Sequence, residues 1–128
     1  MDLPIRPCPL GKVVVTTAGT PVRLTTATEI AGLKPADNVN NMDDARARRI
    51  DFRNPIASPK AVTAGNTGRL YVGVKGMVRS TLVGVIFFLD PGETFTLDNP
   101  QQALPWCLGD YWVDAEVDGE YLTGDFDV

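Results

Sequence analysis

Turn-forming residues interrupt this chain so often that it has little room for helices. The 128 residues include 12 glycines and 10 prolines, and a proline inside a helix removes a hydrogen bond and clashes with the preceding turn. The runs between them are short and rich in valine, threonine, tyrosine and phenylalanine, which favour strands. Short strands separated by turns are typical of sandwiches and barrels. We therefore predict an all-β fold, an antiparallel β-sandwich, of which the jelly roll is one form.

The clearest predicted strands lie in the second half, at residues 69–75, 81–89, 93–97, 111–117 and 121–127. Shorter ones are predicted at 50–53 and 61–63, and residues 12–17 and 21–26 form a predicted hairpin around Ala18-Gly19. The run 81–89 is almost continuously apolar. Such a run predicts a strand that is buried on both faces or covered by a neighbouring subunit.

We predict one β-sandwich domain, residues 11–128, preceded by an extended arm, residues 1–10. Three prolines in the arm favour extended backbone, and its alternating apolar residues indicate that it lies on its own domain or on a neighbour. Residues 27–49 form a predicted long loop, in which Asp43 or Asp44 could cap a helical turn reaching Arg48. Loops of this length inside a compact domain are usually functional, so the loop is a second candidate contact element.

Charge is divided unevenly along the chain. All 12 lysines and arginines lie at or before Arg79, whereas residues 90–128 contain ten acids and no base, so the net charge of −4 conceals a basic part and an acidic part. Alternation along 111–117 places Trp112, Asp114 and Glu116 on one face, which we expect to be exposed. This face is either a solvated edge that charge protects from aggregation, or the partner of the arginine-rich segment 46–53 in another copy.

These observations define a candidate assembly interface between copies of the chain. It draws on the arm, on the arginine-rich segment and on the acidic strand with its turn. The candidate residues are Pro4, Ile5, Arg6, Pro7, Arg46, Arg48, Arg49, Arg53, Asp114, Glu116 and Asp118.

The sequence offers little for catalysis. It has no histidine, the commonest general base and transition-metal ligand, and we expect no enzymatic activity and no cofactor. Residues 114–119 partly match a calcium-binding loop, with Asp125 at its twelfth position, but the flanking segments are predicted strands and hairpin alternation explains the same spacing. Cys8 and Cys107 have no metal-ligand spacing and are either buried thiols or, less readily in a reducing compartment, a disulfide.

Binding to nucleic acid or to a membrane is not expected either. An arginine cluster in an acidic chain is a weak signal for nucleic acid, because the acidic part repels phosphate. No apolar run reaches the roughly 18 residues of a membrane span, and the first residues lack a secretory pattern. We therefore expect synthesis in the cytoplasm.

Several segments resemble a group of small structural proteins of tailed bacteriophages. They are KVVVTTAGTPVRL at 12–24, NTGRLYVG at 66–73, LDPGE at 89–93 and DYWVDAEVDG at 110–119. The resemblance implies a β-sandwich virion component, such as a capsid decoration or stabilising protein, a head spike or a tail-associated part. It departs from that group in the proline-rich arm and in the loop 27–49.

Two functions follow as expectations. The first is a virion structural protein, made in the host bacterial cytoplasm, that assembles as a homo-oligomer on the capsid or at the head-to-tail region, with other copies and the major capsid protein as partners. The alternative is a carbohydrate or host-surface binding module that uses Trp106, Trp112 and the acidic hairpin, with or without calcium.

Overall fold

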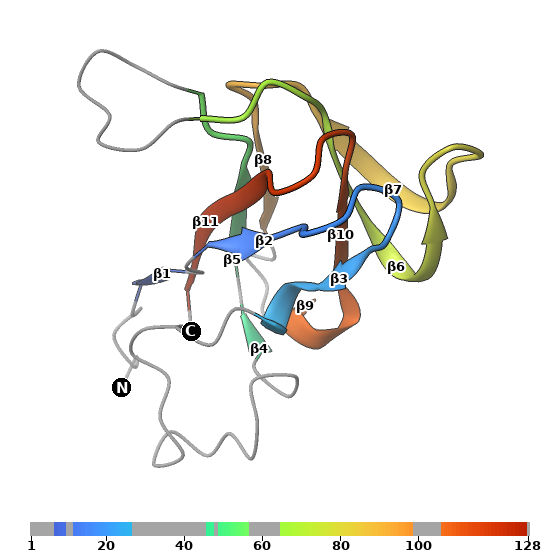
Figure 1. Ribbon diagram of the computed structural model, residues 1–128. Coiled ribbons are helices and arrows are strands. Elements are labelled where there is room, and N and C mark those ends of the chain that lie inside the picture. The colour runs from blue at the N-terminus through green and yellow to red at the C-terminus, as the bar shows by residue number, and fades with distance from the viewer. Residues whose placement is uncertain are drawn as a thin grey trace, which may run out of the picture.

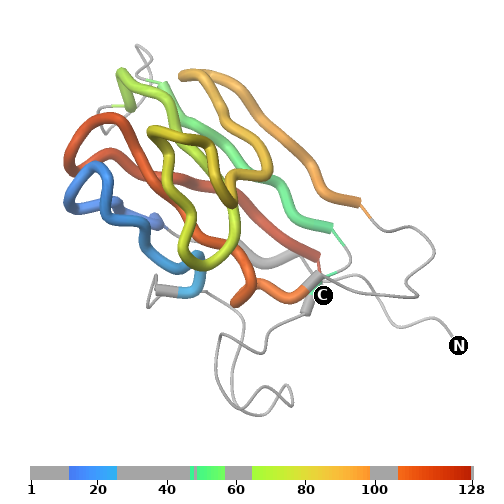
Figure 2. The backbone as a smooth tube through the Cα atoms, turned by 90° about the vertical axis from the view of Figure 1, so that its right-hand side faces the viewer, coloured from blue at the N-terminus to red at the C-terminus, as the bar shows by residue number. Residues whose placement is uncertain are grey.

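The computed structural model describes residues 7–9, 12–26, 46–47, 49–56, 65–98 and 106–127. This part of the chain is all-β, and its antiparallel strands form two principal sheets, as predicted for a β-sandwich. Figure 1 shows the strands, and Figure 2 shows the molecule turned by 90°. The described helical segments are two single 3-10 turns, η1 (Leu24–Thr26) and η4 (Leu108–Asp110).

The first sheet is built around the last strand of the chain. Its order is β1-β11-β5-β8, and β2 also pairs with β11. Its strands are β1 (Pro7–Pro9), β2 (Val13–Val14), β5 (Arg49–Arg53), β8 (Thr94–Asp98) and β11 (Tyr121–Asp127).

The second sheet has the order β3-β10-β6-β7. Its strands are β3 (Val22–Arg23), β6 (Leu70–Val78), β7 (Val83–Leu89) and β10 (Trp112–Ala115). A separate short pair joins β4 (Arg46–Ala47) to β9 (Trp106–Cys107). Arg46 and Ala47 are therefore in a strand, and the predicted helical turn through them is wrong. The rest of that predicted turn, and the predicted strand at 61–63, lie outside the described residues.

The core follows the two-residue alternation of the strands. Val113 and Ala115 of β10 are buried, as are Leu122 and Phe126 of β11, because alternate side chains point into the space between the sheets. Phe52 of β5 lies at the centre of an aromatic cluster. Its ring packs edge-on against Phe87, with centroids 5.2 Å apart, and against Tyr111, at 5.8 Å.

The predicted hairpin of residues 12–17 and 21–26 does not form. β2 pairs with β11 in the first sheet, and β3 pairs with β10 in the second. The turn between them, in which the N–H of Thr20 donates to the oxygen of Thr17, therefore carries the chain from one sheet to the other. Each segment gains a longer partner strand, and Val13, Val15 and Leu24 all reach the core.

Part of the predicted arm lies on its own domain. Pro7, Cys8 and Pro9 form β1, antiparallel to Phe126 and its neighbours in β11. β1 is an edge strand, which is where a sheet tolerates prolines, because only one side of the strand has to supply ladder hydrogen bonds. Pro4, Ile5 and Arg6 lie outside the described residues.

Candidate interaction surface

The β6–β7 hairpin projects from the right-hand side of the molecule in Figure 1 and faces the viewer in Figure 2. The register passes from Val72↔Phe87 to Gly73↔Val85, so Ile86 forms a β-bulge. Gly73 makes the close approach possible, since a Cβ at this position would lie 2.1 Å from the carbonyl oxygen of Gly84. Bulges bend strands and redirect side chains.

Exposed hydrophobic side chains concentrate on this hairpin. Six of the ten large hydrophobic residues that are exposed in the described part of the chain belong to it. We call these six residues the apolar hairpin surface: Val74, Val78, Leu82, Val83, Ile86 and Phe88. The prediction that residues 81–89 are buried on both faces is therefore wrong, because only one face of β7 meets the core. The predicted cover by a neighbouring subunit stays a prediction.

The inner face of β7 is well packed, in contrast to its outer face. The ring of Phe87 stacks on Phe95 of β8 with centroids 4.2 Å apart, which closes the gap between the two sheets on this side. Ile86 and Phe88 alternate with Phe87 along the strand and are 52% and 45% exposed. Arg69 covers part of Phe88, with its guanidinium carbon 4.1 Å from the ring centroid.

β7 lacks the usual protection of an edge strand. Among the described strands it pairs only with β6, and the sequence 81–89 contains neither a charged residue nor a proline. By contrast, the edge strand β1 contains two prolines, and the edge strand β8 ends in Asp98. Natural sheets usually blunt their edges with charges or prolines, and an unblunted apolar edge marks a contact or an aggregation site.

The tip of the hairpin contains a strained residue. Leu82 has a φ of +63° and is 55% exposed. A non-glycine side chain in this left-handed conformation costs roughly 1–2 kcal/mol. An exposed leucine in a strained turn contributes little to folding, and such strain is concentrated at functional sites.

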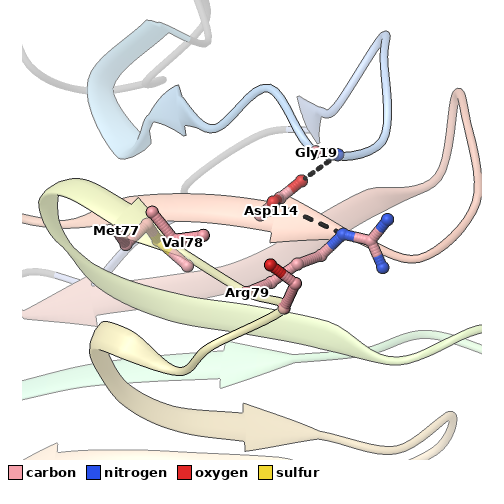
Figure 3. Close-up of a pocket in the computed structure, with 6 residues that line it drawn as sticks. Gly19, Met77, Val78, Arg79 and Asp114 are labelled. Carbon is pink, nitrogen blue, oxygen red and sulfur yellow. Dashed lines mark hydrogen bonds and ion pairs between the residues drawn. The ribbon is translucent and has the colours of Figure 1, made fainter.

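A small cavity of about 150 Å³ lies beside the hairpin, lined by Gly19, Met77, Val78, Arg79, Ser80 and Asp114. Figure 3 shows the Asp114 carboxylate between the Gly19 turn and the Arg79 side chain. Its Oδ1 accepts hydrogen bonds from the N–H groups of Gly19, at 2.9 Å, and Ala115, at 2.8 Å. Its Oδ2 lies 3.6 Å from Nε of Arg79.

Asp114 is thus 1% exposed, and the prediction that it faces solvent is wrong. The alternation along β10 is as predicted, but the Gly19 turn and the hairpin residue Arg79 fold over the outer face at this point. A buried carboxylate is tolerated because hydrogen bonds and a positive charge compensate its lost hydration. Asp114 consequently ties the hairpin and the Gly19 turn to β10.

Glu116 and Asp118 are exposed, as predicted, but each accepts a hydrogen bond within the chain. The Tyr71 hydroxyl donates to Oε1 of Glu116 at 2.8 Å, and the N–H of Ala18 donates to Oδ1 of Asp118 at 2.7 Å. Asp114, Glu116 and Asp118 thus each engage different protein groups. Within the described residues no three acidic, cysteine or histidine side chains are grouped to hold a metal ion.

Two of the candidate arginines meet acids of the same chain. Arg53 lies 2.9 Å from Asp125 of β11, and Arg49 lies 3.1 Å from Asp51 of its own strand. β5 and β11 are neighbours in the first sheet, so folding itself places basic and acidic segments side by side. Arg46 lies in β4, and Arg48 lies outside the described residues.

Two carboxyl groups face each other across this part of the sheet, because Asp51 and Asp125 are register partners. Burial and the neighbouring Asp51 carboxyl raise the pKa of Asp125. Burial also acts to raise the pKa of Asp51, but hydrogen bonds with Thr96 and Asp125 and the charges of Arg49 and Arg53 bring it below its usual value.

A buried polar network at one end of the sandwich was not predicted from the sequence. The Asn54 amide donates to the carbonyl oxygens of Gly68, at 3.0 Å, and Leu89, at 2.8 Å, and the Asn66 amide donates to Asn54 at 2.8 Å. The Glu120 carboxylate accepts the N–H groups of Thr67, at 2.6 Å, and Gly68, at 2.8 Å. Asn66-Thr67-Gly68 looks like an ordinary turn, and only its buried asparagine distinguishes it.

The same network reaches the turn at residues 90–93. The N–H of Gly92 donates to the oxygen of Asn54 at 2.7 Å, and the N–H of Asn54 donates to the oxygen of Glu93 at 3.0 Å. The NTG segment at 66–68 and the PGE segment at 91–93 are therefore held together through Asn54. Their role in this structure is to fasten the turns of the sandwich.

Comparison of the chain with protein families, with curated proteins and with solved structures finds no match. Among the described residues, no helix is long and apolar enough to cross a membrane.

Proposed function

We propose that this protein is a structural component of a tailed-bacteriophage virion, which assembles by protein–protein contact on the capsid or at the head-to-tail region. Its partners are other copies of itself and virion proteins such as the major capsid protein. The observation that carries the proposal is the apolar hairpin surface, since a cluster of exposed apolar side chains on an uncharged edge strand is typical of a contact surface.

The resemblance of four segments to small phage structural proteins supports the virion setting. Two of those segments meet in the network around Asn54, and the DYWVDAEVDG segment supplies Asp114. The similar residues thus lie where they fasten turns rather than where they would bind a substrate.

The carbohydrate-binding alternative is less well supported. It relies on an exposed acidic hairpin, but Asp114 is buried and Glu116 and Asp118 are each engaged by a protein donor. Trp112 is half-buried in β10, opposite Gly73 and Arg23.

The proposal is tested on particles of the phage whose genome encodes this chain. The particles are purified by density gradient, and the chain is quantified by mass spectrometry against the major capsid protein. We expect a fixed stoichiometry that survives repeated banding and high salt. If the chain is absent from banded particles but abundant in the lysate, it is not a virion component.

A further inference from the structure

We infer that the apolar hairpin surface packs against the same surface of a second copy of this chain, related by a two-fold axis. The inference rests on the proposed assembly function and names the first partner of that function. A two-fold contact uses one patch twice, so the patch has to be complementary to itself. The β6–β7 hairpin meets this condition in the charges at its two ends and in its uncharged apolar centre.

The ends of the hairpin carry opposite charge. Lys75 and Arg79 lie near its tip, where β7 begins, and Asp90 and Glu93 follow the end of β7 at Leu89. Arg79 faces Asp114 within its own copy, and Arg69 pairs with Asp90 at 2.7 Å. The net positive charge at the tip therefore comes from Lys75, and the net negative charge at the other end comes from Glu93. A two-fold axis through the middle of β7 reverses the direction of the second strand. It therefore brings the basic tip of each copy to the acidic end of the other, which is an attractive arrangement.

The centre of the surface carries no charge. Residues 80–89 contain no ionisable side chain, whereas the whole chain has a net charge of −4 and repels another copy in most orientations. Ile86 is the middle residue of β7 and 52% exposed, so it lies closest to the two-fold axis. Contact at this point removes apolar surface from water without bringing like charges together.

The contact is formed by side chains rather than by a shared ladder of hydrogen bonds. The bulge at Ile86 interrupts the regular spacing of β7, and bulges at edges hinder the addition of a further strand. The strained Leu82 extends the apolar surface to the tip. A copy seated there covers a leucine that the isolated chain holds in an unfavourable conformation.

The test is analytical ultracentrifugation of the full chain over a wide concentration range, with Ile86→Lys as the disrupting variant. We expect a monomer–dimer equilibrium in which Ile86→Lys raises the dissociation constant at least tenfold. Val14→Lys is the matched control, since Val14 is an exposed strand valine outside the hairpin, at 43%, and we expect no change. Circular dichroism confirms that both variants are folded.

A charge exchange tests the orientation. Lys75→Glu alone places two acids together at each end and is expected to weaken the dimer several-fold, more at low salt than at high salt. Adding Glu93→Lys to the same chain exchanges the two charges, and we expect it to restore the dimer. Failure of the double variant to recover dimerisation overturns the two-fold arrangement.

The outcomes separate this inference from the proposed function. A strict monomer at all concentrations, or a dimer that Ile86→Lys leaves intact, overturns the inference, and the hairpin then faces another protein. A chain that is monomeric in solution but present in particles contradicts only the two-fold contact. A chain that dimerises through the hairpin but is absent from particles contradicts only the virion role.

Discussion

At the scale of single residues, the alternation of residues 111–117 predicted that Asp114 is exposed, whereas the structure buries it. Strand alternation correctly separates Asp114 from Val113, but it cannot show that a remote turn covers the outer face. The residue that covers Asp114 is Arg79, and the turn that caps it contains Gly19. These contacts span 35 and 95 positions, and no local pattern encodes them.

Replacing Asp114 tests whether its contacts with the Gly19 turn and with Arg79 stabilise the fold. We expect Asp114→Ala to lower the free energy of unfolding by about 1–3 kcal/mol, because two backbone N–H groups and Arg79 lose a charged acceptor. The measurement is urea unfolding at neutral pH. Asp118→Ala is the control, since Asp118 is exposed and caps one N–H group, and it is expected to cost less than half as much.

The Asp51 and Asp125 pair gives a pH prediction. The raised pKa of Asp125 means that its stabilising contribution is present below the unfolded value of 3.8 and is lost as pH rises through the folded value. The lowered pKa of Asp51 acts in the opposite sense, with stability present above 3.8 and lost as pH falls through the folded value.

Asp125→Asn removes the ionisable partner while keeping its size. Relative to the wild type, we expect the variant to gain in melting temperature between pH 4 and pH 7, because only the wild type then acquires a second charge beside Asp51. Thermal melts at intervals of half a pH unit measure this. A difference that stays constant across the range, or that falls with pH, contradicts the assignment.

At the scale of elements, strand positions were easier to predict than strand partners. The predicted strand 121–127 has the same limits as β11, and the predicted strand 50–53 differs from β5 by one residue. The predicted hairpin of 12–17 and 21–26 failed because both segments have the composition of strands, while their partners lie far along the chain. Val13 pairs with Leu122 of β11, 109 positions away, and Arg23 pairs with Trp112 of β10, 89 positions away. Local sequence carries no information on such pairings.

The closeness of the two strands in the β6–β7 hairpin depends on Gly73. A Cβ there would lie 2.1 Å from the Gly84 oxygen, so Gly73→Ala has to displace backbone. We expect a loss of about 1–3 kcal/mol in the free energy of unfolding. Gly19→Ala provides the comparison, since it introduces strain at a φ of +89° but no atom lies within 4 Å. Gly73→Ala, unlike Gly19→Ala, is also expected to weaken the proposed dimer.

Leu82 allows stability and assembly to be separated. Leu82→Gly relieves the cost of a positive φ and is expected to raise the free energy of unfolding of the monomer by up to about 1 kcal/mol. The same variant removes an exposed apolar side chain and is expected to weaken association. Denaturant unfolding at low concentration and sedimentation at high concentration measure the two effects. If the variant loses stability, Leu82 is not strained.

At the scale of the whole molecule, the basic and acidic parts of the sequence meet within a single copy of the chain. The basic strand β5 lies between two strands from the acidic part, β11 and β8, and Arg53 pairs with Asp125. The sequence shows the asymmetry but cannot decide whether the opposite charges meet within a copy or between copies. Arg53, one residue of the candidate assembly interface, thus forms an ion pair within its own copy. The apolar hairpin surface is therefore the main candidate for a contact between copies.

The sequence predicted the apolar hairpin surface only in part. The apolar run 81–89 predicted either full burial or cover by a neighbouring subunit, and the structure removes the first alternative. The exposure of Ile86 and Phe88 depends on β7 being an edge strand, which is a property of the sheet order. Sheet order follows from long-range pairing, and the sequence pattern alone could not supply it.

Hydrogen–deuterium exchange of the protein, free in dilute solution and then assembled in purified particles, tests the central claim most directly. We expect peptides covering residues 78–89 to become strongly protected on assembly, while peptides covering 12–20 change little. Protection of other segments, with 78–89 exchanging as fast in particles as in the free protein, would contradict an account in which the β6–β7 hairpin is the contact surface.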